Sequence, residues 1–399
     1  FYGSKYAEYD LTSKTWWIAA GSQGLANYSP DNGTYNTFLP SGPASNLSFR
    51  LKYDNERIIA VPGARWADRA ANKAFVMVYE NGMWTNTDYD ELTTLAGQEV
   101  YDFMNVAVDP RDKDHFFVTS YGCGIYEYQD MKPIKRYTPD NSTISAAAPG
   151  YEKFYTRTDG AVWDKFNNLW VMSTGQYGPN INILTPDGNW YATNIYANGQ
   201  RVVYHTPQEI VIDNKRSSYK WIANGRDVPG LGLHDDNGTP TDFSDDRSTF
   251  RTSLHDQDNN DISIELVFAC AQDNNGDIWL GTLTGPLVIP NSTDFFTSDL
   301  CQRVKISRTD GSQLADYLLA DERINVITVD GANRKWIGTH NSGAYLLSED
   351  GTQTIYHFTT DNSPMPSNTV QSIVVNPKTG EVFIGTETGL VSFQSDATE

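Results

Sequence analysis

The sequence predicts an all-β fold, a β-propeller of four-stranded blades, and three observations lead to this prediction. A short phrase recurs along the chain, as in "DIWLGTLTGPLVI", "RKWIGTHNSGAYLL" and "EVFIGTETGLVSF", and such recurrence indicates a repeated structural unit. Apolar and polar residues alternate before each copy, which is typical of half-buried strands. Aromatic residues make up 13% of the 399 residues and charged residues only 20%, a composition that suits strands joined by polar turns.

Aligning the copies on their central apolar residue defines eight repeat units. These central residues are Trp17, Ile59, Phe117, Trp170, Trp221, Trp279, Trp336 and Phe383. Their spacing of roughly fifty residues matches four short strands with tight turns, which is one propeller blade. The second unit is the weakest, because it lacks an aromatic residue and carries the insertion "GARWADRAANKA".

Eight units predict a propeller of seven or eight blades. We expect a single propeller over residues 1–399, forming part of a longer multidomain protein. The alternative is that the first unit, residues 1–43, belongs to a preceding propeller, which leaves seven blades.

The recurring phrase has a physical explanation in such a ring. A middle strand of a blade is covered on both faces by neighbouring blades, so it reads as a continuous apolar run. We expect Trp279 to fill the wedge between two blades. Gly281 is expected where a Cβ atom would crowd the adjacent sheet, and Gly285 at a turn with positive φ.

Composition excludes several classes of partner and site. The formal net charge is −20 and no basic run occurs, which argues against nucleic acid and against docking on an anionic membrane. The apolar runs are too short to span a bilayer, so we expect no direct membrane insertion of this chain. The three cysteines, Cys123, Cys270 and Cys301, form no CxxC pair. Cys270 and Cys301 could form a disulfide in an oxidising compartment, although Cys270 in "ELVFACA" is better explained as a small buried apolar residue.

A search for catalytic motifs finds none, and we expect no catalytic residue. The six histidines form no HxH or HExxH pair, and neither GxSxG nor a P-loop is present. Carboxylates brought together at the ring axis by the fold stay open as an alternative, as in a propeller glycosidase or lyase.

The most acidic stretch, "HDDNGTPTDFSDDRS", raises the question of a cation site. Asp235, Asn237, Asp242 and Asp246 could supply oxygen ligands to calcium, but Pro240 stands where an EF-hand register needs glycine. We expect a solvated hairpin and no cofactor. Calcium binding is the alternative.

The turns after the central strands should gather on one face of the ring, around its opening. The candidate ligand-binding residues there are Arg65, Trp66, Arg69, Tyr121, Tyr177, Arg226, Asp227, His340 and Asn341. Aromatic side chains beside arginine and asparagine suit a sugar or a peptide, through stacking and bidentate hydrogen bonds. The competing explanation is that loops are polar in any case.

At "NRKWIGTHNSGAYLLSEDG" and "GEVFIGTETGLVSF" the units resemble the regulator-propeller repeats of bacterial two-component sensors. Over its whole length the chain more closely resembles the propeller part of the type IX secretion (Por system) accessory protein. This resemblance implies a periplasmic or cell-surface protein of a Gram-negative bacterium, with tandem propellers and a C-terminal β-sandwich. It also implies a role in attaching secreted cargo to anionic lipopolysaccharide. That partner fits a chain of charge −20 only through a local basic pocket or a bridging cation, and the resemblance assigns no site residue.

The sequence therefore predicts a non-enzymatic extracytoplasmic propeller of this secretion system, which binds a glycan such as lipopolysaccharide or a protein of the secretion machinery. One alternative is the ligand-sensing ectodomain of a hybrid two-component system. The other is a propeller hydrolase or lyase, for which two carboxylates facing each other across the ring axis would be the signature.

Overall fold

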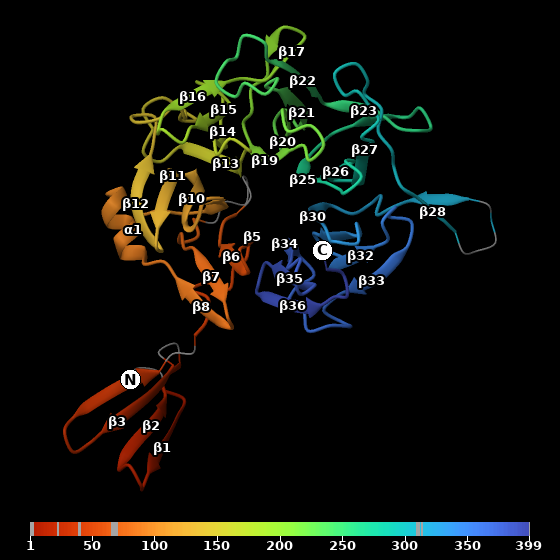
Figure 1. Cartoon of the computed structure of the whole chain (residues 1–399). Helices are drawn as coiled ribbons and strands as arrows, with labels where there is room; N and C mark the ends of the chain where they lie inside the picture. Colours follow the sequence, from red (N-terminus) through yellow and green to blue (C-terminus); the bar gives the residue numbers. More distant parts are fainter. Residues whose placement is uncertain are drawn as a thin grey trace. The chain divides into compact units, whose positions relative to one another are not determined.

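The computed structural model describes residues 4–21, 24–38, 41–64, 71–308, 312 and 314–398 (Figure 1). Contacts divide the chain into two compact units. The smaller one comprises residues 1–43 and 79–85, and the larger one comprises residues 44–78 and 86–399. Almost all regular structure is antiparallel strand, as the sequence predicts.

The smaller unit is built on one four-stranded antiparallel sheet in the order β1-β2-β3-β4. Its strands are β1 (Tyr6–Asp10), β2 (Thr15–Ala19), β3 (Leu25–Ser29) and β4 (Thr34–Phe38). Large apolar side chains of this sheet and its turns are exposed, including Leu11 at 83% and Tyr35 at 61%. The sheet thus has little core of its own.

The remaining sheets follow one another along the chain, each folded as an antiparallel meander. The first contains β5 (Arg50–Asp54), β6 (Arg57–Val61), β7 (Met77–Glu80) and β8 (Met83–Asn86). Residues 79–85 of β7, β8 and the turn between them are grouped by their contacts with the smaller unit, and the other residues of this sheet with the larger one. The next two contain β9 (Phe103–Asp109), β10 (Asp112–Gly122), β11 (Gly124–Gln129) and β12 (Lys132–Tyr137), then β13 (Thr156–Trp163), β14 (Leu169–Ser173), β15 (Ile181–Leu184) and β16 (Trp190–Thr193). These two are joined, because the long strand β10 pairs with β13 at Tyr121↔Arg157 and Gly122↔Thr156.

Four further sheets complete the larger unit. The first two contain β19 (Pro207–Ile212), β20 (Tyr219–Asn224), β21 (Gly230–Asp235) and β22 (Arg247–Arg251), then β25 (Val267–Gln272), β26 (Ile278–Thr282) and β27 (Gly285–Ile289). The last two contain β30 (Ile324–Val329), β31 (Lys335–Thr339), β32 (Ala344–Leu347) and β33 (Thr354–Phe358), then β34 (Val370–Val375), β35 (Glu381–Thr386) and β36 (Leu390–Gln394). Short hairpins lie in the connections between successive sheets. They are formed by β17 (Tyr196–Ala197) with β18 (Gln200–Arg201), β23 (Ser253–His255) with β24 (Asp261–Ser263), and β28 (Lys305–Ser307) with β29 (Ala315–Tyr317).

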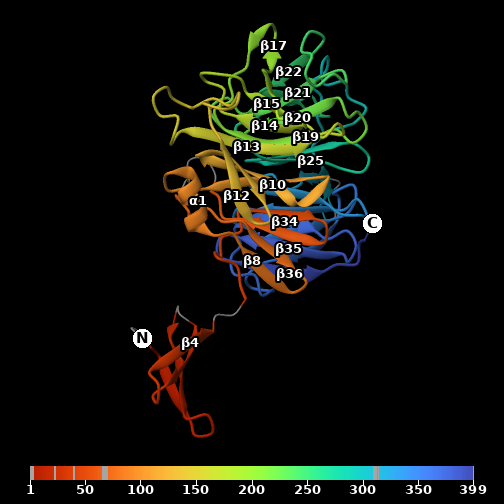
Figure 2. The same ribbon diagram turned by 60° about the vertical axis from the view of Figure 1, so that its left-hand side comes forward.

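The first strand of each sheet in the larger unit packs against the first strand of the next. The sequence of contacts runs β5, β9, β13, β19, β25, β30 and β34, and β34 returns to contact β5. These strands therefore close a ring, with the later strands of each sheet lying outward from its centre (Figure 1). The turned view shows β34, β35 and β36 in this order from the centre to the rim (Figure 2).

The central residues of the repeat all lie in the second strand of a sheet. In the larger unit they are buried, from Ile59 in β6 to Phe383 in β35. An aspartate in the preceding turn positions several of the indoles. Asp164 Oδ1 accepts the backbone N–H groups of Phe166 and Asn168 at 2.8 and 2.9 Å, and its Oδ2 accepts the indole N–H of Trp170 at 2.9 Å. One carboxylate thus closes the turn and satisfies a buried donor.

A glycine lies two residues after Trp279, Trp336 and Phe383, and close packing of neighbouring sheets requires it there. A Cβ atom on Gly281 would lie 2.9 Å from the carbonyl oxygen of Ile324, at the start of the next sheet. On Gly385 it would lie 2.6 Å from the carbonyl oxygen of Ser48, just before β5, where the last sheet meets the first. Gly285 has φ +90°, so the expected positive-φ turn is present.

One helix departs from the strand-only expectation. The helix α1 (Tyr89–Ala96) begins at Asp88, whose side chain accepts the N–H groups of Asp90 and Glu91, and ends at Gly97 with φ +65°. This is a standard capped helix. Among the described residues, no helix is long and apolar enough to cross a membrane.

Candidate functional site

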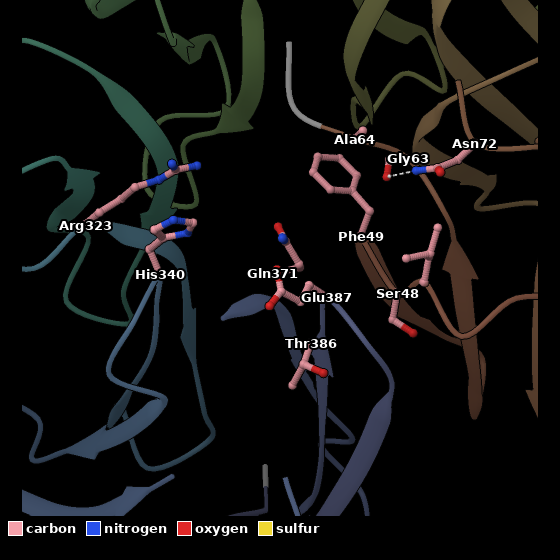
Figure 3. Close-up of a pocket in the computed structure, with 11 residues that line it drawn as sticks. Ser48, Phe49, Gly63, Ala64, Asn72, Arg323, His340, Gln371, Thr386 and Glu387 are labelled. Atoms are coloured by element: carbon pink, nitrogen blue, oxygen red, sulfur yellow. Dashed lines mark hydrogen bonds between the residues drawn. The ribbon is translucent and has the colours of Figure 1, made fainter. Parts of the chain in front are cut away.

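The larger unit contains a pocket of about 450 Å³ at one end of its ring (Figure 3). Its lining residues lie where first strands begin and second strands end. They are Leu47, Ser48 and Phe49 before and beside β5, Gly63 and Ala64 after β6, Asn72, Arg323 before β30, His340 after β31, Gln371 in β34, Thr386 in β35, and Glu387 after it. Three non-adjacent parts of the sequence therefore meet at one opening.

The recurring Gly-Thr phrase explains how two of these side chains are positioned. Thr339 Oγ1 donates to the carbonyl of Gly343 at 2.9 Å, and Thr386 Oγ1 donates to the carbonyl of Gly389 at 2.8 Å. Each threonine closes the turn that follows its strand, so the next residue is presented at the end of the ring. That residue is His340 in one sheet and Glu387 in the next.

Arg323 and His340 form a basic wall of the pocket and lie next to each other in Figure 3. The backbone N–H of His340 donates to the carbonyl of Arg323 at 3.0 Å, which fixes their spacing. The Arg323 guanidinium donates from Nε to Asn325 Oδ1 at 3.0 Å and lies 4.1 Å from the ring centre of Phe268. A cation held over an aromatic face is oriented at little entropic cost to later binding.

Glu387 and Gln371 lie between this wall and the opposite side, where Phe49 and Asn72 lie (Figure 3). Glu387 Oε1 accepts the hydroxyl of Ser367 at 3.0 Å, and its backbone N–H donates to Thr369 at 3.1 Å. Asn72 Nδ2 donates to the carbonyl of Gly63 at 3.4 Å. The pocket thus offers cationic, anionic and amide groups beside one aromatic face. Its volume is within the range of small-molecule sites.

The structure distributes the predicted ring-face residues unevenly. His340 lines the pocket, whereas the neighbouring Asn341 is exposed and does not. Tyr177 is 58% exposed and also lies outside the lining. Arg65, Trp66 and Arg69 lie outside the described residues.

Tyr121, also predicted, lies buried beside the pocket in an apolar cluster with Phe49 and Phe268. Burial raises the pKa of its phenol, and the positive charges of Arg157 and Arg226 partly oppose this. Arg226 lies 3.9 Å from Asp227, which has φ +69°. Among the predicted residues that the structure describes, only His340 lines this pocket, and ligand binding by the predicted residues stays a prediction.

Sequence reasoning missed most of the lining, notably Arg323, Gln371, Glu387, Phe49 and Asn72. A signal existed for Glu387, because it follows the Gly-Thr of its phrase as His340 does. Arg323 and Gln371 lie at the start of first strands, before the repeated phrase, and carry no comparable signal.

Three of the four residues considered for calcium are engaged by other groups, and Asp235 pairs with Arg247 at 2.9 Å. Asp246 Oδ2 lies 3.3 Å from His234 Nε2, but neither oxygen of this buried carboxylate has a hydrogen-bond partner among the described residues. Asn237 donates to Asp245 at 2.8 Å, and Asp242 accepts from Ser244 at 2.7 Å. Within the described part of the chain, no group of three or more His, Cys, Asp or Glu side chains is arranged to hold a metal ion. Calcium binding by Asp235, Asn237, Asp242 and Asp246 stays a prediction.

No protein-family model matches this chain, and no curated protein matches it. Among solved structures it is similar to PorZ, described as an essential bacterial surface component of the type IX secretion system of Porphyromonas gingivalis. The identity is 27% and the TM-score 0.84 over 96% of this chain, which spans 52% of that protein.

Two propellers are similar to this chain in fold alone. The β-propeller domain of Cps50 (Swd1) from Myceliophteria thermophila has 10% identity and a TM-score of 0.55, over 89% of this chain and 100% of that one. The WD40 β-propeller domain of Doa1 has 10% identity and a TM-score of 0.51, over 89% and 95%. The predicted all-β propeller architecture and the predicted resemblance to the type IX secretion accessory protein are confirmed.

Proposed function

We propose that this chain is a non-enzymatic binding propeller of a type IX secretion accessory protein, located at the cell surface or in the periplasm of a Gram-negative bacterium. The similarity to PorZ over 96% of the chain, at a TM-score of 0.84, is the observation that carries the proposal. Because the chain spans 52% of that protein, the role concerns a part of a larger molecule.

Within this role, the pocket at the end of the ring binds the partner, a glycan or a protein of the secretion machinery. The juxtaposition of Arg323, His340 and Glu387 with Phe49 supports this assignment. A sugar or peptide presents both hydrogen-bonding groups and an apolar face, and these match the amide, charged and aromatic groups of the lining. The basic wall also gives an acidic ligand a local cationic contact on a chain whose net charge is −20.

The test is binding of the whole chain to a glycan array and to purified secretion-machinery proteins, with and without EDTA. Arg323→Gln should weaken a genuine pocket ligand at least tenfold, because the guanidinium fork is lost. The matched control is Arg308→Gln, since Arg308 lies on an exposed hairpin and pairs with Asp316. Equal binding by the wild type and Arg323→Gln would place the partner elsewhere. Loss of wild-type binding only when EDTA is present would indicate that a divalent cation such as calcium takes part.

We further propose that the propeller consists of seven blades, and that the sheet β1–β4 belongs to a preceding propeller. The cyclic contacts of β5, β9, β13, β19, β25, β30 and β34 support the first part. The separate compact unit and its exposed apolar side chains support the second, because a blade-type sheet needs a covering layer on each face.

A further inference from the structure

A second cavity, of about 280 Å³, lies on the axis of the ring in the larger unit. Its walls are the first strands of the sheets, and its polar lining residues include Arg50, Lys52, Asn105, Glu209, Thr328 and Ser372. This volume is below the usual range for drug-sized ligands, so the cavity suits a small ion with water rather than an oligosaccharide. None of these residues lines the pocket at the end of the ring.

An ion pair crosses this cavity. Arg50 Nη1 in β5 lies 3.2 Å from Glu209 Oε1 in β19. These two strands are not neighbours in the ring, since β5 contacts β34 and β9 whereas β19 contacts β13 and β25. The pair leaves much of the guanidinium unused, because Arg50 Nε and Nη2 are buried and have no hydrogen-bond partner among the described residues.

Lys52 places a second cation in the same cavity. It follows Arg50 by two residues in β5, so both side chains lie on one face of the strand. Within the described residues it forms no ion pair or hydrogen bond. Burial lowers the pKa of its ammonium group, the charges of Asp54 and Glu209 partly oppose this, and the Arg50 guanidinium lowers the pKa further.

Several hydroxyl and amide groups around the two cations donate to backbone carbonyls. Ser372 Oγ donates to Ser48, Thr328 Oγ1 to Ile373, and Asn325 Nδ2 to Val370. Two acidic groups act on Arg50, namely Glu209 and the buried Asp159 in β13. The unused hydrogen-bonding capacity of the cavity therefore includes two donors of the Arg50 guanidinium and the ammonium of Lys52. The two Arg50 donors are buried, and buried donors without acceptors are costly.

We propose that this axial cavity binds a small oxyanion, such as inorganic phosphate, between the guanidinium of Arg50 and the ammonium of Lys52. A tetrahedral oxyanion presents several acceptor oxygens, so it can accept from Arg50 Nε and Nη2 on one side and from Lys52 Nζ on the other. The Arg50–Glu209 pair stays intact, because it uses Nη1. This site is independent of the partner-binding pocket proposed above.

The test is calorimetric titration of the whole chain with inorganic phosphate at low ionic strength. The wild type should show one saturable site and an increase in Tm with phosphate, because a ligand that binds only the folded state stabilises it. Lys52→Met should weaken phosphate binding at least tenfold and remove the Tm increase. The matched control Lys165→Met changes an exposed lysine of the same unit and should bind as the wild type does.

Two further measurements keep the test decisive. Lys52→Arg retains a cation at this position and should retain phosphate binding, so a loss in Lys52→Met cannot be attributed to misfolding when the Tm values without phosphate agree. Titration with glycerol phosphate distinguishes the free ion from its esters. If only inorganic phosphate binds, the free ion is the occupant; if glycerol phosphate binds as well, the cavity recognises the oxyanion group of either. Absence of saturable phosphate binding in the wild type, or equal weakening in Lys52→Met and Lys165→Met, overturns the proposal. Ligand binding at the pocket should be unchanged in Lys52→Met.

Discussion

The indole N–H of Trp279 donates to Asp273 Oδ2 at 3.2 Å, and Lys335 from the next sheet places its ammonium 2.9 Å from the same oxygen. Lys335 Nζ also donates to the carbonyls of Asn333 and Glu349 and lies 5.0 Å from the Trp279 ring centre. Both charged side chains are almost fully buried. Two adjacent sheets are therefore joined by one buried, fully hydrogen-bonded cation.

Lys335→Met should lower the free energy of unfolding by about 3–5 kcal/mol, because it leaves the Asp273 carboxylate buried without its cation. Urea denaturation followed by tryptophan fluorescence measures the loss. Lys305→Met is the matched control, since the Lys305–Asp258 pair is about 40% exposed, and it should cost less than about 1 kcal/mol. Similar losses in the two variants would show that the buried Lys335–Asp273 pair stabilises the fold no more than the exposed pair does.

His115 should make the stability of the larger unit depend on pH. Its Nε2 lies 2.9 Å from Glu127 Oε1, and its Nδ1 lies 2.9 Å from Asp109 Oδ2. The hydrogen bond to Glu127 has the larger effect, and together the two bonds raise the pKa of His115 above 6.5. The protonated imidazole is thus favoured in the folded state. Its stabilisation is fully present below the unfolded-state pKa and is lost as the pH rises through the folded-state pKa.

The His115→Gln substitution should therefore cost more stability at about pH 5.5 than at about pH 8.5. Chemical denaturation of both proteins at the two pH values measures the difference. A cost independent of pH would mean that the imidazole is neutral throughout and acts by packing against Phe117, which it contacts edge-on.

The three thiols should be unreactive in the folded protein. Cys123, Cys270 and Cys301 are buried, so a reagent cannot reach them in the folded protein. Burial also raises the pKa of the Cys270 thiol and raises that of Cys301 to about 12, so almost no thiolate forms at these two residues at neutral pH. Mass spectrometry after iodoacetamide treatment should find no adduct before denaturation and three afterwards. Rapid labelling of the native protein would contradict the packing around Cys270 and Cys301, which share one apolar cluster.

Amides of β2 should exchange with solvent far faster than those of β31. Residues of β31 are all buried, whereas β2 is at most partly buried and belongs to a sheet with little core. Local opening is easier where few apolar contacts must be broken. Hydrogen exchange followed by mass spectrometry compares the peptides directly. Equal protection would mean that the sheet β1–β4 is stabilised in this chain by contacts other than its own core.

The second strand of each sheet was predictable, because its signal is local. A tryptophan followed by Gly-Thr marks both the buried strand and the turn after it, as at Trp279 and Trp336. The helix α1 also had a local signal that the repeat obscured: Asp88 and Gly97 are its capping residues. An aspartate six residues before the tryptophan marks the indole partner, as with Asp164 and Asp273.

The pocket was much less predictable, because its residues are brought together by ring closure. Phe49 and Glu387 are far apart in the sequence and meet only where the last sheet packs against the first. The axial pair Arg50–Glu209 has the same origin. No spacing rule connects residues whose proximity depends on every intervening sheet.

The pairing of β10 with β13 through Tyr121 and Gly122 has a mechanical consequence. Because two successive sheets are hydrogen-bonded to each other through paired strands, a force that pulls one of them away from the ring also acts on the other. This sector should yield as a block of eight strands, and a tear in the ring would start between two sheets that have no paired strands across their junction.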